Sequence, residues 1–226
     1  MEFNDGNKYH YVTDANSYAR HRDMYEMRTC SAINGQMYVD PQFEYQRRIL
    51  QPLMRGYLHY QFPYQNAGSP EKQADFFCNV IGTLRSNEMV MLDTEGASGL
   101  SDPCDFAVRW CARVEARFST LCWIYVPQAL ARVLTREVLG PRLIKAPRYS
   151  GNANRGTPPS WSYDVWQYTD RGFFPGSPHG PGDVNYSDLT TQQLLDRCTQ
   201  FDRPTLRKGD SGPWVRELQS KLARVW

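Results

Sequence analysis

MVMLDTEG, residues 89–96, is the stretch of sequence from which we infer the fold. Its first four residues form an apolar run, which is typical of a strand buried in a parallel sheet. The carboxylates Asp93 and Glu95 follow, and Gly96 permits a turn. Because side chains alternate along a strand, we expect the two carboxylates to point to the same side.

Further strands and helices alternate on both sides of this stretch. Short apolar or alternating runs predict strands at residues 25–30, 56–62, 121–126, 143–146 and 163–168. A proline, in two cases after a polar capping residue, predicts helices over 41–54 and from Ser69-Pro70, Asp102-Pro103 and Pro127. Residues 147–162 and 171–187 are rich in Gly, Pro, Ser and Asn, and we expect both to be loops.

This alternation predicts an α/β fold with a parallel sheet. The chain has 226 residues, and about 200 to 250 residues are normal for one (β/α) barrel. We therefore expect an irregular TIM-like barrel, with an open doubly wound sheet as the alternative. No glycine-rich phosphate loop follows an expected strand, which disfavours nucleotide binding.

The composition argues against several classes of protein. The net charge is +2, and no block of basic residues indicates a nucleic-acid partner. No apolar run approaches the length of a membrane span, and residues 1–12 lack the pattern of a signal peptide. The six cysteines form no CxxC pair, so we expect buried thiols and no metal site. No G-x-S-x-G motif supports a serine nucleophile.

Asp93 and Glu95 are the first candidates for chemistry. At the C-terminal mouth of a barrel, two neighbouring acids cannot both ionise freely, so one becomes a proton donor while the other stays charged. Cleavage of a glycosidic bond uses such a pair, one acid for the leaving oxygen and one carboxylate to support positive charge on the sugar. The plain alternative is a solvated strand end with a turn at Gly96.

A second region, YDVWQYT at residues 163–169, combines aromatic and amide side chains. Trp166 and Tyr168 could form an aromatic wall against a sugar ring, and Gln167 could donate or accept a hydrogen bond. Asp183 follows in a glycine-rich stretch. The plain alternative is a core aromatic strand followed by an aspartate that caps a turn.

Four stretches, taken together and in this order, resemble the family 25 glycoside hydrolases, the lysozymes of phage endolysins and bacterial autolysins. They are NGQMYVDPQF at 34–43, GYLHY at 56–60, LDTE at 92–95, and VWQYT at 165–169 with Asp183-Val184-Asn185. The resemblance covers roughly residues 10–195. It implies an irregular β/α barrel that cleaves the β-1,4 bond between N-acetylmuramic acid and N-acetylglucosamine in bacterial peptidoglycan.

The resemblance also implies roles for single residues. Glu95 would be the general acid, and Asp93 would stabilise a substrate-assisted intermediate on a retaining route; an inverting route is the alternative. Asp183 matches the late aspartate of the family site, and Asp14, in VTDANSY at 12–18, is the nearest match to its early aspartate on the first strand. The expected substrate-binding residues are Tyr60, Tyr125, Trp166, Gln167 and Tyr168. No cofactor is expected.

The chain divides into an expected catalytic domain at residues 1–200 and a C-terminal segment at 201–226. Within the latter, LRKGDSGPWVRELQSKL resembles the first part of a peptidoglycan-binding module, preceded by a linker and ending after one short helix. The missing signal pattern suggests a phage endolysin, made as a monomer in the host cytoplasm and released to the wall through a holin-type hole.

Two other functions remain open at this point. A non-catalytic wall-binding protein could use the same barrel, although retention of both acids argues against it. A chitinase-like hydrolase would carry earlier aspartates in a D-x-x-D-x-D-x-E motif, which EMVMLDTE at residues 88–95 lacks.

Overall fold

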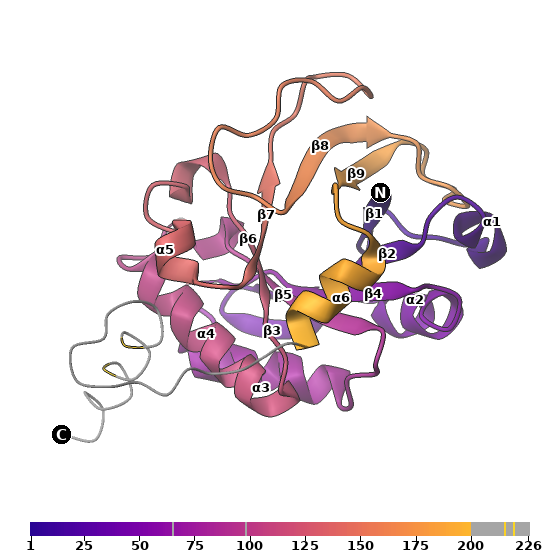
Figure 1. Cartoon of the computed structure of the whole chain (residues 1–226). Helices are drawn as coiled ribbons and strands as arrows, with labels where there is room; N and C mark the ends of the chain where they lie inside the picture. The colour runs from indigo at the N-terminus through magenta and orange to yellow at the C-terminus, as the bar shows by residue number, and fades with distance from the viewer. Residues whose placement is uncertain (65, 98, 200–214, 216–218, 220–226) are drawn as a thin grey trace.

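The computed structural model describes residues 1–64, 66–97 and 99–199, together with Val215 and Gln219 (Figure 1). Its strands are β1 (Glu2–Gly6), β2 (Met24–Ile33), β3 (Gln36–Val39), β4 (Gly56–Gln61), β5 (Glu88–Asp93), β6 (Trp123–Tyr125), β7 (Leu143–Pro147), β8 (Val165–Gly172) and β9 (Gly182–Tyr186). Its helices are α1 (Ala15–Ala19), α2 (Phe43–Leu50), α3 (Pro70–Ile81), α4 (Pro103–Phe118), α5 (Arg136–Leu139) and α6 (Thr191–Thr199), with short 3-10 helices η1 (Glu95–Ala97) and η2 (Gln128–Leu130). The predicted linker and wall-binding segment otherwise lie outside the described residues.

The strands close into a barrel, as the sequence predicts. In the described part of the chain the sheet has the order β1-β9-β8-β7-β6-β5-β4-β2-β3, and β1 also pairs with β2. That second pairing closes a ring from which only β3 is excluded, because β3 forms a hairpin on the edge of β2. Figure 1 shows α3 and α4 packed side by side outside the ring.

The sheet is mixed, which corrects the expectation of a parallel one. The neighbours from β1 through β2, β4, β5, β6 and β7 to β8 run parallel, but β9 runs antiparallel to both β8 and β1. Neither β9 (GDVNY) nor β1 (EFNDG) was expected, and residues 171–187 were expected to be a loop. Both strands are short and rich in polar residues, so they lack the apolar pattern by which strands are found.

The two long outer helices begin where the sequence predicts. The Ser69 hydroxyl accepts a hydrogen bond from the Lys72 backbone at 3.3 Å, and the Asp102 carboxylate accepts one from the Asp105 backbone at 2.9 Å. These caps satisfy amide groups of the first turn, and a proline follows each cap. The helix expected from Pro127 is instead the short η2, with α5 separate from it.

Side chains inside the barrel change from apolar to polar along each strand. At one end Phe3, Leu58, Met89, Trp123 and Val165 form a buried cluster, which Leu194 and Leu195 of α6 complete. Two positions further along several strands the inward side chain is polar, because residues i and i+2 share a face. Helix α6 therefore covers the apolar end, and the opposite end is left as a polar mouth. No helix in the described ranges is both long and apolar enough to cross a membrane.

A buried ion pair fastens α4 to the segment before β7. Arg142 donates from Nε and Nη2 to the two carboxylate oxygens of Glu115 at 2.6 and 2.7 Å, and both side chains are almost fully buried. Replacement of Arg142 by Met would leave the buried Glu115 carboxylate without its cationic partner. We therefore expect a loss of about 3–5 kcal/mol in the free energy of unfolding.

Urea denaturation would measure this loss. The matched control is Arg113→Met, which removes a similar pair with Asp75 whose side chains are about half exposed. Exposed pairs contribute about 0–1 kcal/mol. Equal losses in the two variants would contradict a structural role for the buried pair.

Candidate active site

The polar mouth of the barrel holds a pocket of about 180 Å³, called the mouth pocket below. Every strand of the ring contributes at least one side chain to it. These are Asp5 (β1), Glu26 and Arg28 (β2), Tyr60 (β4), Asp93 (β5), Tyr125 (β6), Lys145 (β7), Gln167 (β8) and Asp183 (β9), and Asn7, Phe62, Glu95 and Tyr149 come from the loops.

The direction of each strand explains this convergence. Parallel strands present their carboxyl ends at the same end of a barrel, and sites form there. Strand β9 runs the opposite way, so its beginning lies at this end, and Asp183 is its second residue. Asp183 therefore reaches the same pocket as Asp93, although one residue begins its strand and the other ends its strand.

The turn after β5 places Asp93 and Glu95 together. The Asp93 carboxylate accepts a hydrogen bond from the Glu95 backbone at 3.0 Å, and the Thr94 hydroxyl donates to the Tyr125 carbonyl at 2.6 Å. Glu95 thus begins η1. The sequence argument assumed instead that Glu95 continues the strand. Both carboxylates still line the mouth pocket, Asp93 buried and Glu95 exposed.

Gly96 is required for this turn. A Cβ atom at position 96 would lie 2.0 Å from the Pro63 carbonyl oxygen and 2.9 Å from the Phe62 ring. Such contacts are far too short, so only glycine lets the chain pass here. The close approach fixes Glu95 at the rim of the pocket.

A hydrogen-bonded network joins Glu95 to β6, β8 and the loop after β7. The Tyr125 hydroxyl lies 3.2 Å from Glu95 Oε1 and 2.9 Å from Gln167 Oε1, and the Tyr149 hydroxyl donates to Gln167 at 2.7 Å. Burial is the main cause that raises the pKa of Tyr125. Tyr125 consequently keeps its single proton, which can be directed at only one of its two acceptors at a time.

Five carboxylates, called the carboxylate cluster below, line the pocket: Asp5, Glu26, Asp93, Glu95 and Asp183. The Lys145 ammonium group lies within the cluster. It donates to the two oxygens of Glu26 at 2.7 and 2.6 Å and lies 3.9 Å from Asp5 Oδ2.

Burial and crowding raise the pKa of several of these carboxylates. For Asp93 burial is the larger cause and repulsion from Glu95 the second; for Asp5 burial comes first and repulsion from Glu26 second. Burial also raises the pKa of Asp183. In the folded protein Asp93 therefore holds its proton to a higher pH than an exposed aspartate does.

Six of the nine residues that the sequence singles out line the mouth pocket: Tyr60, Asp93, Glu95, Tyr125, Gln167 and Asp183. Asp14 does not. It is exposed and caps α1, where its carboxylate accepts a hydrogen bond from the Ser17 backbone at 2.8 Å. Asp14 therefore does not lie on the first strand, where the early aspartate was expected; that strand is β1, and its pocket-facing aspartate is Asp5.

Trp166 and Tyr168 also lie outside the pocket. They pack with Val184 in a separate cluster, and they point away from the lumen because they alternate with the inward Gln167. The Trp166 ring nitrogen donates to the Arg148 carbonyl at 2.9 Å, and the Tyr168 hydroxyl donates to Glu2 at 2.9 Å. The expected aromatic wall is a packing element here.

Sequence reasoning missed several residues of the pocket, among them Asp5, Glu26, Arg28, Lys145 and Tyr149. Asp5 had only a weak signal: it directly precedes a glycine, but its strand lacks the apolar pattern by which strands are found. Glu26 and Lys145 had none, because charged residues inside short strands resemble the exposed faces of ordinary strands.

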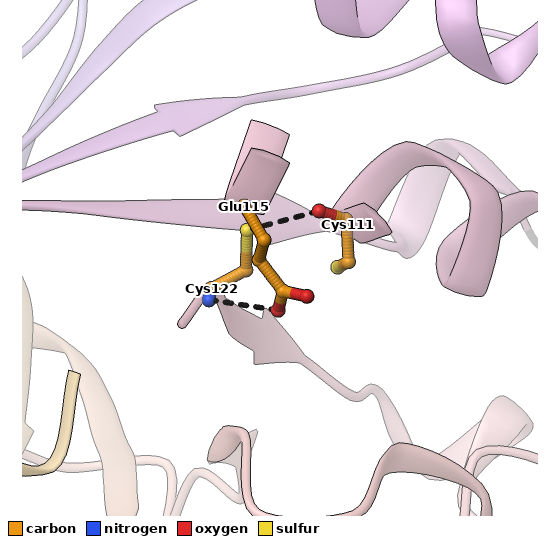
Figure 2. Close-up of side chains that lie close together, drawn as sticks. All are labelled: Cys111, Glu115 and Cys122. Carbon is orange, nitrogen blue, oxygen red and sulfur yellow. Dashed lines mark hydrogen bonds between the residues drawn. The ribbon is translucent and has the colours of Figure 1, made fainter. Parts of the chain in front are cut away.

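One other group of side chains has the residue types of a metal site. Cys111, Glu115 and Cys122 bring their ligand atoms within 4.8 Å of one another, and within the described ranges no other group of three does so (Figure 2). Both Glu115 oxygens, however, accept hydrogen bonds from Arg142, and one also accepts from the Cys122 backbone at 3.1 Å. Burial also raises the pKa of the Cys122 thiol, so thiolate ligands are disfavoured. All six cysteines are free, and the group is part of the packed core.

Comparisons with known proteins agree with this geometry. The solved structures similar to the chain include a bacterial lysozyme from Streptomyces coelicolor, with 18% identity, a TM-score of 0.71, and coverage of 88% of this chain and 97% of that chain. The catalytic domain of an endolysin from a Listeria monocytogenes bacteriophage has 17% identity, a TM-score of 0.69, and coverage of 87% and 96%. A muramidase from Acremonium alcalophilum has 20% identity, a TM-score of 0.66, and coverage of 88% and 99%.

Among curated protein sequences the chain has no match. The model of glycosyl hydrolases family 25, in contrast, matches residues 9–177, which is well over half of the chain. That segment includes Asp93, Glu95, Tyr125 and Lys145 of the mouth pocket. The chain therefore belongs to glycosyl hydrolases family 25, the lysozyme family of glycoside hydrolases.

Proposed function

We propose that this muramidase cleaves the β-1,4 bond between N-acetylmuramic acid and N-acetylglucosamine in the mouth pocket, with Glu95 as the general acid and Asp93 as the partner of the substrate's N-acetyl group. The observation that carries the proposal is that Asp93 and Glu95 line one pocket together with Asp5 and Asp183, at the mouth of the family barrel. Two other pockets in the described chain hold fewer carboxylates: one has none, and the other has Asp5, Asp170 and Asp183.

The surroundings of Glu95 support its role as proton donor. Tyr125 is closer to Gln167 than to Glu95, at 2.9 against 3.2 Å, so its proton is better directed at Gln167. The Tyr125 oxygen is then free to accept a hydrogen bond from a protonated Glu95. Glu95 is also exposed at the rim, where it can reach a glycosidic oxygen.

The surroundings of Asp93 support its role as the partner of the acetamido group. It is buried beneath Glu95, and one of its oxygens accepts the Glu95 backbone hydrogen bond, which fixes the carboxyl group. The other oxygen can accept a hydrogen bond from the substrate's acetamido N–H. That contact favours the charged form of Asp93 and holds the acetamido carbonyl oxygen against the anomeric carbon.

The reaction then balances without a cofactor. Glu95 gives its proton to the leaving oxygen while the glycosidic C–O bond breaks and the acetamido oxygen bonds to the anomeric carbon. The Asp93 carboxylate stabilises the positive charge of this cyclic intermediate. Water next attacks the anomeric carbon and gives a proton back to Glu95, while the bond between that carbon and the acetamido oxygen breaks and restores the acetamido group. The anomeric carbon is thus inverted twice, so the configuration is retained.

Glu95→Gln tests the assignment of the general acid. Without a proton to donate, we expect cleavage of purified peptidoglycan to fall by about 10²–10⁴-fold. The control is Glu44→Gln, an exposed carboxylate on α2, which should cleave like the wild type.

The products identify the bond. Mass spectrometry after borohydride reduction should find new muramic-acid reducing ends for the wild type and the control. New glucosamine ends, cut peptides, or undiminished cleavage by the Glu95 variant would contradict the proposal.

Asp183→Asn and Asp14→Asn form a second, matched pair. Asp183 lines the pocket and Asp14 lies outside it, so we expect about a hundredfold loss of activity for the first variant and none for the second. Asparagine caps a helix as well as aspartate does, so the Asp14 variant should also keep its stability. Activity measured on the same peptidoglycan checks both, and a larger loss for Asp14→Asn would place the early aspartate where the sequence argument put it.

The role of phage endolysin stays a prediction. Solved structures similar to the chain include an endolysin domain, but the bacterial and fungal muramidases are similar to the same degree. Cell lysis from inside, by the protein co-expressed with a membrane-permeabilising holin, is the experiment that addresses this role.

A further inference from the structure

Lys145 is a buried cation whose position the reaction above does not explain. It stands on β7, yet its ammonium group reaches across the lumen to Glu26 on β2 and approaches Asp5 on β1. Its side chain is only 1% exposed, and its nitrogen lies 5.3 Å from the centre of the Tyr125 ring. A lysine this deep is costly to bury unless its charge is paired.

Glu26 is saturated by its partners. Both of its oxygens accept hydrogen bonds from Lys145, and Asn185 Nδ2 also donates to Oε2 at 3.3 Å. Asn185 and Asp183 lie two residues apart on β9, so they share the inward face. Because its oxygens are occupied in this way, Glu26 is better suited to hold Lys145 in place than to give or take a proton in the reaction.

The rest of the carboxylate cluster has little other positive charge near it within the mouth pocket. His10 lines an adjoining pocket with Asp5 and Asp183, and its attraction lowers the pKa of Asp183. Of the described residues that line the mouth pocket, only Lys145 and Arg28 are cationic. The Arg28 guanidinium is bound to Asp40, at 2.9 Å from Nε and 2.7 Å from Nη2. Lys145 therefore supplies the charge that opposes repulsion among Asp5, Asp93 and Asp183.

The electrostatic consequence has a definite sign. Burial is the largest cause for Asp5, Asp93 and Asp183 and raises the pKa of each, whereas attraction to Lys145 lowers it and so limits the rise. Other titratable groups that face the pocket are Glu95 and the hydroxyls of Tyr60, Tyr125 and Tyr149. Burial raises the pKa of all three tyrosines, so they stay neutral and cannot replace the missing charge.

We propose that Lys145 is a positioning residue of the muramidase site: held by Glu26, its ammonium group keeps Asp93 and its neighbours charged at the pH at which the enzyme works. The inference rests on the proposed function, since a charged Asp93 is needed there to receive the acetamido group. Lys145 touches no reacting atom in this account and acts through the carboxylates.

The experiment compares the pH dependence of peptidoglycan cleavage in the wild type with that in Lys145→Met and Lys145→Arg. We expect the acidic limb, where activity is lost as Asp93 takes up a proton, to lie at least about one pH unit higher in Lys145→Met than in the wild type. At pH values below both limbs, this difference corresponds to about a tenfold lower activity than that of the wild type. Lys145→Arg keeps the positive charge and should leave the limb close to that of the wild type.

A second variant and a second readout keep the test decisive if Lys145→Met does not fold. Glu26→Gln/Lys145→Met removes the charge of Glu26 together with that of its partner, so it should fold when the single variant does not, and we expect its acidic limb to move in the same direction. Carboxyl carbon-13 NMR titration of aspartate-labelled protein, with Asp93 assigned by Asp93→Asn, measures the protonation of Asp93 without any activity.

The outcomes separate the two proposals. Suppose that the wild type cleaves and Glu95→Gln does not. The role of Lys145 is then overturned if the acidic limb and the Asp93 titration of both Lys145→Met variants match those of the wild type. A loss of activity that is equal at every pH overturns it too, because that is the signature of a purely structural residue. If Glu95→Gln cleaves like the wild type, the proposed function fails, and the NMR titration still decides whether Lys145 sets the charge of Asp93.

Discussion

The pairing of β1 with both β2 and β9 is the constraint on which the site depends. In the register of these strands Asp5 lies beside Glu26, and the neighbouring Asn4 lies beside Val184. This single short strand closes the ring and brings β9, which carries Asp183, next to the strands that carry the other acids. Without the closure, Asp93 and Glu95 would lie at the end of a central strand of an open sheet, with no opposite wall to enclose a sugar.

The interior of the barrel is built to tolerate this concentration of charge. Asp5, Asp93 and Asp183 have raised pKa values in the folded protein, so the folded state binds their protons more tightly than the unfolded chain does. They consequently lower stability at pH values above those pKa values, and this loss disappears as the pH falls below them. The apolar cluster under α6 offsets the loss, and the Lys145–Glu26 pair limits it. One end of the barrel thus stabilises the fold, and the other end holds buried carboxylates that destabilise it. Such a trade between stability and an active site is common in enzymes.

The sequence was informative where the barrel is apolar and ambiguous where it is polar. The run at residues 89–93, the capped helices α3 and α4, and the strands near residues 56, 123 and 143 were predicted because their core faces are continuous. Strands β1 and β9 were missed because their inward side chains line a pocket, which gives them the polarity of a loop. For the same reason the sequence favours Asp14 over Asp5, because nothing in residues 2–6 marks them as a strand.

Side-chain direction and long-range pairing were the other limits. Trp166 and Tyr168 were grouped with Gln167 by proximity in sequence, whereas alternation along β8 puts them on the opposite face. Lys145 and Glu26 are 119 positions apart, and nothing local indicates that they meet. The resemblance to the family supplied the acid pair and Asp183, but it carried no information on the charge that faces them.

The central claim is that the glycan is cleaved in the pocket closed by β1, between Glu95 and Asp93. The most direct measurement is a crystal structure of the Glu95→Gln variant with a peptidoglycan tetrasaccharide bound. The account predicts the scissile oxygen within hydrogen-bond distance of residue 95 and the acetamido N–H of the adjoining sugar on Asp93. A glycan that lies outside the pocket, with its scissile bond away from both side chains, would contradict it.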